Sequence, residues 1–179
     1  EEREAPYDFV IAGAGDLDPR QGRRRRSVAE ELLPRIGTSL LLVRGRPRRP
    51  ERILICTAVG EPGKADIRAG GWLARRLGAS ATLLHVVIPN RTAVSVARSH
   101  LQRGIATLRE LEVVSNASIR EAETPLGGIL AELRAENYDL VVIGAPPRYA
   151  RAPLRGTPVT LQVLRQAGCS ILVVAPDTW

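Results

Sequence analysis

The feature that most constrains this chain is an internal repeat at an offset of 131 residues (138 − 7). Residues 7–14 read Tyr-Asp-Phe-Val-Ile-Ala-Gly-Ala, and residues 138–145 read Tyr-Asp-Leu-Val-Val-Ile-Gly-Ala. At the same offset, and without a gap, Ser39–Val43 matches Ser170–Val174. Because the register persists through a loop, a helical segment and a second apolar run, we interpret the two segments as copies of one structural unit.

Each copy is predicted to be a β-α-β unit. A short apolar run ending in glycine, Asp8–Gly13 or Asp139–Gly144, is typical of a buried strand. A helix follows and ends near Gly37 or Gly168, where glycine suits a left-handed helix stop. A second apolar strand completes the unit. Strands that are apolar throughout belong to parallel sheets covered on both faces, so the pattern favours an α/β fold.

The sequence between the copies supplies the rest of a complete domain. Residues 46–51, rich in arginine and proline, are predicted to be a linker between a partial copy over residues 1–45 and a complete domain over residues 52–179. Hydrophobic spacing in that domain predicts strand Arg52–Thr57, helix Lys64–Leu77, strand Ala81–Val87, helix Val94–Leu108, edge strand Ala117–Glu123 and a helix from Pro125 through Leu133. With the second repeat unit, the order predicts a doubly wound sheet.

This order of elements resembles the universal stress protein family. The most similar stretches are Arg-Ile-Leu-Ile at 52–55, Ala-Thr-Leu-Leu-His-Val-Val at 81–87, the strand at 138–144 and the ending at 163–174. The resemblance covers Arg52–Pro176 completely, whereas Tyr7–Val43 matches only the last third of a family domain. It implies a doubly wound, five-stranded parallel sheet in the order 3-2-1-4-5, Rossmann-like and of the adenine-nucleotide alpha-hydrolase-like type, plus an N-terminal β-α-β half-repeat.

The resemblance also implies a ligand site where the strand order reverses, between the first and fourth strands of the complete domain. ATP-binding members carry an aspartate after the first strand and Gly-x2-Gly-x9-Gly-Ser/Thr after the fourth. Here Ala58 stands at the aspartate position, Gly144 fits the first glycine, and Pro147 replaces the second. Because proline has no N–H and a fixed φ, it is a poor substitute where amides cradle a phosphate. The last pair, Gly156-Thr157, is restored only if the loop is one residue shorter.

These departures predict that ATP binds weakly or not at all, so the cofactor is left open. If a nucleotide or another small anion does bind at this end of the sheet, its expected contacts are Ala58, Val87, Gly144, Ala145, Arg155, Gly156 and Thr157.

A run of four arginines is the sharpest charge feature. Clustered guanidinium groups before a helix that Ser27 could cap are a candidate anion site, formed by Arg23, Arg24, Arg25, Arg26 and Ser27. The alternative is a solvated loop whose charge is balanced by Glu30 and Glu31.

The histidines and cysteines do not suggest chemistry. His85 lies within an apolar strand and is predicted to be a core residue, whereas His100 is predicted to lie on the solvated side of its helix. Cys56 and Cys169 are predicted to be reduced core thiols. No Cys/His spacing indicates zinc and no Ser-His-Asp set is visible, so we expect no metal and no enzymatic activity.

Composition narrows the function further. The net charge of +7 comes almost wholly from arginine, and an aromatic content of 3% is too low for the stacking that single-stranded nucleic acids require. No apolar run is long enough to cross a bilayer, and the thiols favour the cytoplasm. We therefore expect a non-catalytic regulatory domain for the stress response. The alternatives are a cytoplasmic regulatory domain of a membrane transporter of the cation/proton antiporter type, which would suit a fragment of a longer protein, and an enzyme of the wider nucleotide-binding class.

The half-repeat leads to an expectation about assembly. Its first strand, Asp8–Gly13, would lie inside a complete sheet, and only Ser39–Val43 is present to pair with it. Bare apolar edges invite pairing with another chain. Family members associate through the last strand, so Ser39–Val43 is expected to pair with Ser170–Val174, within the chain or across a dimer. A homodimer that also shields the bare edge is expected.

Overall fold

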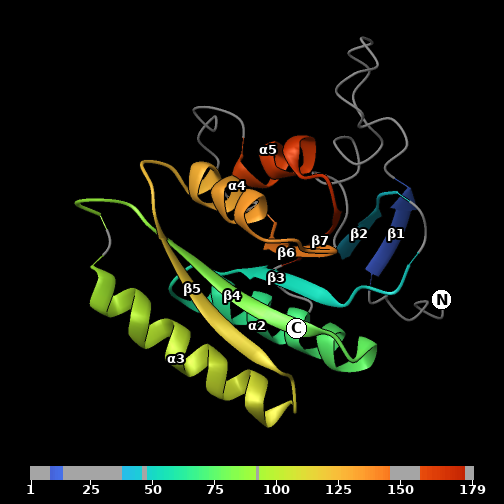
Figure 1. Cartoon of the computed structure of the whole chain (residues 1–179), viewed down its shortest axis with the longest axis horizontal. Coiled ribbons are helices and arrows are strands. Elements are labelled where there is room, and N and C mark those ends of the chain that lie inside the picture. Colours follow the sequence, from blue (N-terminus) through green and yellow to red (C-terminus); the bar gives the residue numbers. More distant parts are fainter. Residues whose placement is uncertain (1–8, 14–37, 46–47, 92, 146–157, 176–179) are drawn as a thin grey trace, which may run out of the picture.

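The computed structural model describes residues 9–13, 38–45, 48–91, 93–145 and 158–175, and these form one layered α/β body (Figure 1). Within those ranges, none of the helices combines the length and apolar character needed to cross a membrane. The elements, in chain order, are β1 (Phe9–Gly13), β2 (Ser39–Val43), β3 (Arg52–Cys56), α2 (Glu61–Leu77), β4 (Ser80–Val87), α3 (Val94–Glu110), β5 (Ser115–Glu121), α4 (Pro125–Ala135), β6 (Leu140–Gly144), α5 (Val159–Gln166) and β7 (Ser170–Val174).

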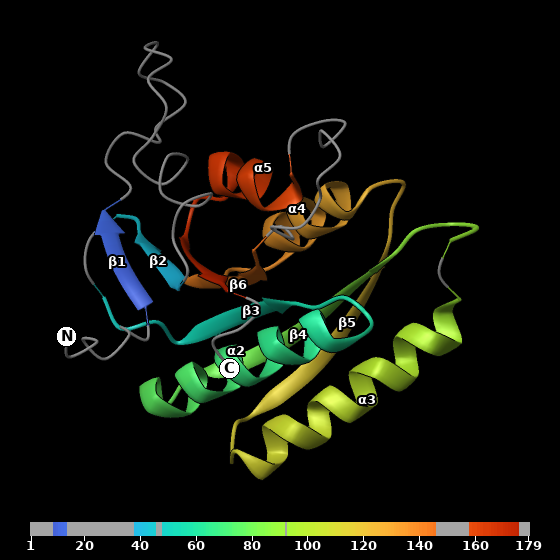
Figure 2. The ribbon, with the colours of Figure 1, turned by 180° about the vertical axis from the view of Figure 1, so that it is seen from behind.

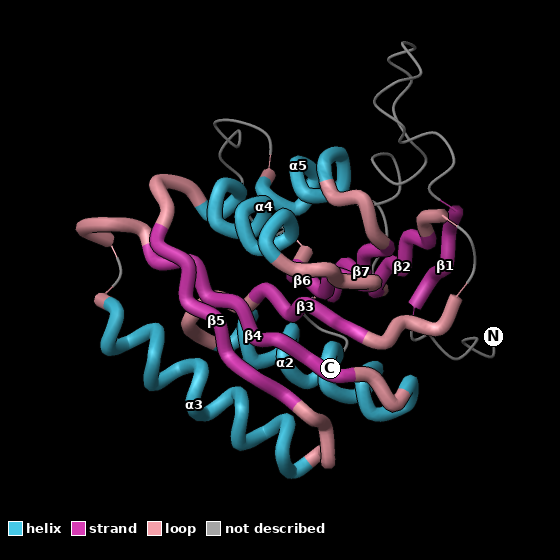
Figure 3. The backbone as a smooth tube through the Cα atoms, viewed as in Figure 1, coloured by secondary structure: helices cyan, strands magenta, loops and turns pink. Residues whose placement is uncertain are grey.

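The described strands form a single seven-stranded sheet in the order β1-β2-β7-β6-β3-β4-β5 (Figure 3). The last five positions are all parallel and correspond to the order 3-2-1-4-5 of the complete domain. The predicted fold class is therefore confirmed, with two more strands added at one side. At the opposite side β5 is an edge strand, as predicted, although it begins two residues earlier than expected.

The two added strands come from the half-repeat, and β2 joins the sheet antiparallel to β7 with Leu41 opposite Leu172. The predicted pairing of the two last strands thus occurs within the chain. It is reinforced at both ends, since Ser39 Oγ accepts from the Ala175 N–H at 3.1 Å and Ser170 Oγ accepts from the Arg44 N–H at 3.1 Å. The helix predicted between the strands of the half-repeat lies outside the described residues, and the division at 46–51 into two units stays a prediction.

Helices cover both faces of the sheet: α2 and α3 lie together on one face, and α4 and α5 lie together on the other (Figures 1 and 2). Side chains alternate along a strand, so β3 contributes to two cores. Ile53 and Ile55 belong to the core under α2 and α3, whereas Leu54 and Cys56 belong to the core under α4 and α5. Both cysteines are free thiols, as predicted.

One glycine sets how closely a helix meets the sheet, whereas another does not end its helix as predicted. A Cβ at Gly70 would lie 2.6 Å from Ile55 Cδ1, so the absence of a side chain at this position lets α2 approach the sheet closely. The left-handed stop predicted at Gly168 is wrong. Helix α5 ends at Gln166, Ala167 is extended, and a bend at Gly168 and Cys169, without a positive φ at the glycine, leads into β7.

Candidate functional site

The strand order reverses between β3 and β6, where the chain leaves the two strands toward opposite faces of the sheet. In parallel α/β sheets this reversal creates a crevice at the carboxyl ends of the strands. The register pairs Ile55 with Val142, so Thr57 and Gly144 stand at the same level on either side of the reversal. Ala58, the next residue, is exposed.

Four of the predicted ligand contacts lie at this edge of the sheet: Ala58 follows β3, Val87 ends β4, Gly144 ends β6 and Ala145 follows it. Arg155, Gly156 and Thr157 lie outside the described residues, as do Arg23, Arg24, Arg25, Arg26 and Ser27. The Val87 side chain is buried, and its carbonyl accepts from the Ala122 N–H at 3.1 Å, so its polar backbone oxygen is already paired.

Hydrogen bonds and a carboxylate already take up part of the space around Gly144. Its carbonyl accepts a hydrogen bond from the Thr160 hydroxyl at 2.8 Å, and the next N–H, of Ala145, donates to the Val174 carbonyl at 2.8 Å. On the other side, a Cβ at this position would lie 3.0 Å from Oδ1 and 3.2 Å from Oδ2 of Asp66. A carboxylate from α2 therefore packs directly against the glycine that the sequence assigned to phosphate binding.

Asp66 is an unusual acid. It is only 5% exposed, and within the described ranges no donor reaches its carboxylate. Burial raises its pKa to about 7, because the charged form loses its hydration without a compensating partner. Near neutral pH this side chain is therefore divided between the neutral and the charged form. Sequence reasoning missed it, although its position four residues before the sheet-facing Gly70 places it on the inner side of α2.

A second polar cluster joins the end of β3 to α3 and β4 through Thr57. His100 Nε2 lies 2.9 Å from the Thr57 hydroxyl, and His85 Nδ1 lies 2.9 Å from the Thr57 carbonyl oxygen. The two imidazole rings meet edge to face with centroids 6.1 Å apart. His85 is a core residue as predicted. The prediction for His100 is wrong, because this side chain is 4% exposed and faces the sheet.

The hydrogen bonds fix the tautomers of both histidines. The Thr57 hydroxyl has one hydrogen, which it donates to the Gly63 carbonyl at 3.0 Å, so it accepts from His100 Nε2–H. A carbonyl only accepts, so His85 donates through Nδ1–H, and its Nε2 is a buried atom without a hydrogen-bond partner among the described residues. Burial is the main reason why the pKa of His100 is lowered, and the nearby His85, Arg103 and Lys64 add to it.

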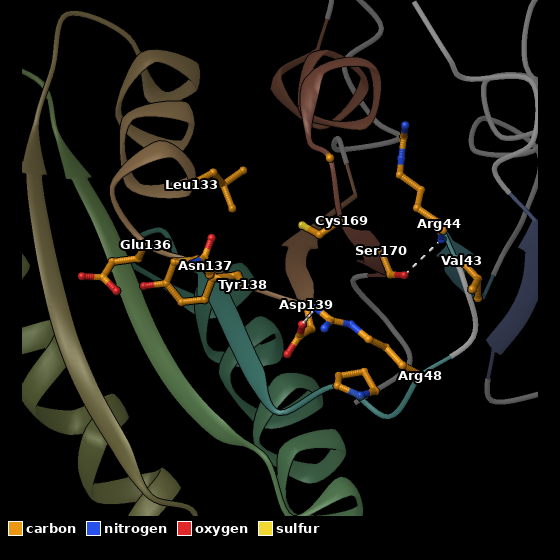
Figure 4. A pocket seen from close by; sticks show the side chains of 13 residues that line it. Val43, Arg44, Arg48, Leu133, Glu136, Asn137, Tyr138, Asp139, Cys169 and Ser170 are labelled. Atoms are coloured by element: carbon orange, nitrogen blue, oxygen red, sulfur yellow. Dashed lines mark hydrogen bonds and ion pairs between the residues drawn. The ribbon is translucent and has the colours of Figure 1, made fainter.

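A further cavity, of about 410 Å³, lies at the opposite end of the strands, where β2 meets β6 and β7 (Figure 4). Asp139 organises its rim. Its carboxylate accepts from the Glu51 N–H at 2.9 Å and the Arg52 N–H at 3.0 Å, and it pairs with the Arg48 guanidinium. Next to it, the Tyr138 hydroxyl donates to Glu132 at 2.9 Å. Tyr138 and Asp139, which begin this repeat copy, thus connect the start of β6 to α4 and to the segment before β3.

The architecture defines a class: a doubly wound α/β domain whose strand order reverses between β3 and β6. The family model for the universal stress protein family matches residues 50–175. The chain belongs to this family. No curated protein matches it.

Solved structures show the same fold. A universal stress protein from Archaeoglobus fulgidus DSM 4304 aligns with a TM-score of 0.67 at 15% identity, covering 94% of this chain; the chain spans 60% of that protein. A universal stress protein in complex with cAMP aligns with a TM-score of 0.58 at 13% identity, covering 73% of this chain and 100% of that one. A third, from Archaeoglobus fulgidus in complex with dAMP, aligns with a TM-score of 0.52 at 15% identity, covering 71% of this chain and 98% of that one.

Proposed function

We propose that this chain is a non-catalytic, cytoplasmic regulatory domain of the universal stress type, which acts through assembly and whose crevice binds ATP weakly or not at all. The observation that carries the proposal is the Asp66 carboxylate packed against Gly144. A charged carboxylate at this position repels phosphate groups, and Ala58 supplies no carboxylate of its own at the end of β3.

Nucleotides remain the reasonable ligand class to test. Two solved proteins of the same fold are complexes with cAMP and dAMP, which carry one phosphate each. A ligand of low charge suffers less repulsion from Asp66 than ATP does. The proposed order of affinity at neutral pH is therefore cAMP above AMP above ATP.

The absence of catalysis is proposed because the polar groups at this edge are committed to structure. Thr57 holds His85 and His100 through its carbonyl and its hydroxyl, and Gly144 is bonded to Thr160. Within the described ranges, no group of three or more His, Cys, Asp or Glu is placed to hold a metal ion.

Calorimetric titration with ATP, AMP and cAMP at pH 6 and pH 8 tests the proposal. cAMP keeps the same charge over this range, so its pH dependence reports the protein alone. Wild type should bind all three more weakly at pH 8, and Asp66→Asn should tighten binding about tenfold at pH 8, as expected for removing one charge at short range. Glu110→Gln, an exposed residue of α3, is the charge-matched control and should change nothing. Low-micromolar ATP affinity of the wild type at pH 8 would overturn the proposal.

A further inference from the structure

A groove of about 210 Å³ lies between α2 and α3. It reaches the end of β3 through His100, which is bonded to Thr57, and its lining includes none of Ala58, Val87, Gly144 and Ala145. Lys64 and Arg68 line it from α2, and His100 and Arg103 line it from α3. Beside the groove, α3 packs closely against β4 and α2. A Cβ at Gly104 would lie 2.6 Å from Leu83 Cδ1 and 2.9 Å from Ile67 Cδ1, so only glycine lets α3 approach this closely.

The charge of the groove has one sign. Its lining contains three cationic side chains and a histidine but no carboxylate. Lys64 pairs with Glu61 at 2.5 Å, and this exposed i,i+3 pair contributes little to hold the ammonium in place. For Arg68 and Arg103 the described part of the chain shows no ion pair. Two guanidinium groups therefore face one concavity without an ion pair among the described residues, and the ammonium group beside them has Glu61 as its counter-charge.

We propose that this groove binds a phosphate-type oxyanion. Guanidinium groups bind such anions through two parallel N–H donors, and Arg68 and Arg103 reach the groove from different helices. Lys64 adds a third positive charge from the first turn of α2. The ligand is free phosphate or the phosphate group of a small monoester, since the volume of the groove suits an oxyanion better than a whole dinucleotide.

His100 couples this site to pH. Its Nε2–H is committed to Thr57, so the atom that gains a proton is Nδ1. An anion in the groove offsets the repulsion from the neighbouring cations and favours protonation there. The charged or titratable groups around His100 are His85 from β4, Arg103 from its own helix, and Glu61, Lys64, Asp66 and Arg68 from α2. Binding of the anion should therefore raise the pKa of His100, and binding should be tighter at low pH.

Sulfate is the first probe, because it stays a dianion between pH 5 and pH 8 and so isolates the protonation of the protein. The ring nitrogens of His100 are followed by NMR with and without sulfate, with chloride at the same ionic strength as the reference. We expect sulfate to raise the pKa of His100 by at least half a unit. In Arg103→Gln and in Arg68→Gln, sulfate affinity should fall about tenfold, as for the loss of a charge-assisted pair.

Three control variants test whether the sulfate effect depends on the residues of this groove. Arg98→Gln removes a cation of α3 that faces the separate groove against β5, and it should bind sulfate like the wild type. Replacing Arg23–Arg26 by serine should also leave the sulfate effect on His100 intact. In Asp66→Asn the effect should persist, which separates His100 from the other group that titrates near neutral pH. An unchanged pKa of His100 in saturating sulfate, or equal sulfate affinity in wild type and Arg103→Gln, would overturn the proposal.

AMP and inorganic phosphate then distinguish the two sources of the phosphate group. AMP that displaces sulfate from the wild type, and loses affinity in Arg103→Gln, identifies a monoester as the ligand. Displacement by inorganic phosphate but not by AMP identifies free phosphate. Failure of both to displace sulfate at millimolar concentration would contradict a phosphate-type ligand.

Discussion

The Thr57 hydroxyl accepts a hydrogen bond from His100 Nε2 at 2.9 Å, joining two residues that are 43 positions apart in the sequence. This contact ties the carboxyl end of β3 to the middle of α3. Thr57→Val should therefore lower the free energy of unfolding by about 1–3 kcal/mol, because it leaves a buried imidazole N–H without an acceptor. Thr57→Ser keeps the hydroxyl and should cost less. Urea unfolding of the two variants checks this, and equal stabilities would contradict the contact.

Asp66 should make stability depend on pH in a direction opposite to that of most acids. Its pKa is about 7 in the folded protein and near 3.9 in an unfolded chain, so between these values only the folded state holds the proton. Stability therefore falls as pH rises from about 4 to 7. At pH 8 the charged form costs on the order of 2–4 kcal/mol. Asp66→Asn should raise Tm at pH 8 and change it little at pH 4.5, and a rise of the same size at both values would count against this account.

Asp139 should behave in the usual way for an acid. Its burial favours the neutral form, but the N–H groups of Glu51 and Arg52 and the charges of Arg48 and Arg52 outweigh this and lower its pKa. The stabilisation is therefore complete above the unfolded pKa and is lost as pH falls through the folded one. Asp139→Asn should lower stability at pH 7 by about 1–3 kcal/mol. Chemical unfolding over a series of pH values from 7 downward checks this, since the difference between wild type and variant should shrink once pH falls below the unfolded pKa of the carboxyl group.

The protein should be a homodimer that shields the edge of β1. Ile11, in the middle of this strand, is 62% exposed, and β2 is its partner among the described strands. Ile11→Lys should weaken the dimer, because an edge lysine opposes strand pairing. Val114→Lys, at a still more exposed apolar position just before β5, is the control. Light scattering at several concentrations measures the molar mass of wild type and both variants. A wild-type monomer of 19.4 kDa at high concentration would contradict the prediction.

Much of the fold could be predicted because its strands and helices follow from patterns of apolar residues over short stretches of sequence. The repeat and the apolar runs identify the strands. The match identifies Ser39–Val43 and Ser170–Val174 as the last strands of their copies, and the family's association through last strands predicted that they pair. The candidate site was harder. His100 lies three residues after Ala97 and next to Leu101, both of which are buried, yet its polarity suggested the solvated side of the helix. Its acceptor, Thr57, lies on another element. Contacts of this kind depend on how α3 sits on the sheet, which spacing along one helix does not reveal.

The antiparallel junction between β2 and β7 has a consequence for how this chain responds to dilution. Two separate molecules that pair through their last strands come apart as concentration falls, whereas here both strands belong to one polypeptide, in which residues 44–51 join β2 to the first strand of the complete domain. A short tether of this kind holds its ends at an effective local concentration of about millimolar. The tether is also anchored, since Arg49 Nε donates to the Leu77 carbonyl at 2.5 Å. The junction is therefore unimolecular, and the last strand of the complete domain keeps its neighbour however scarce the protein becomes.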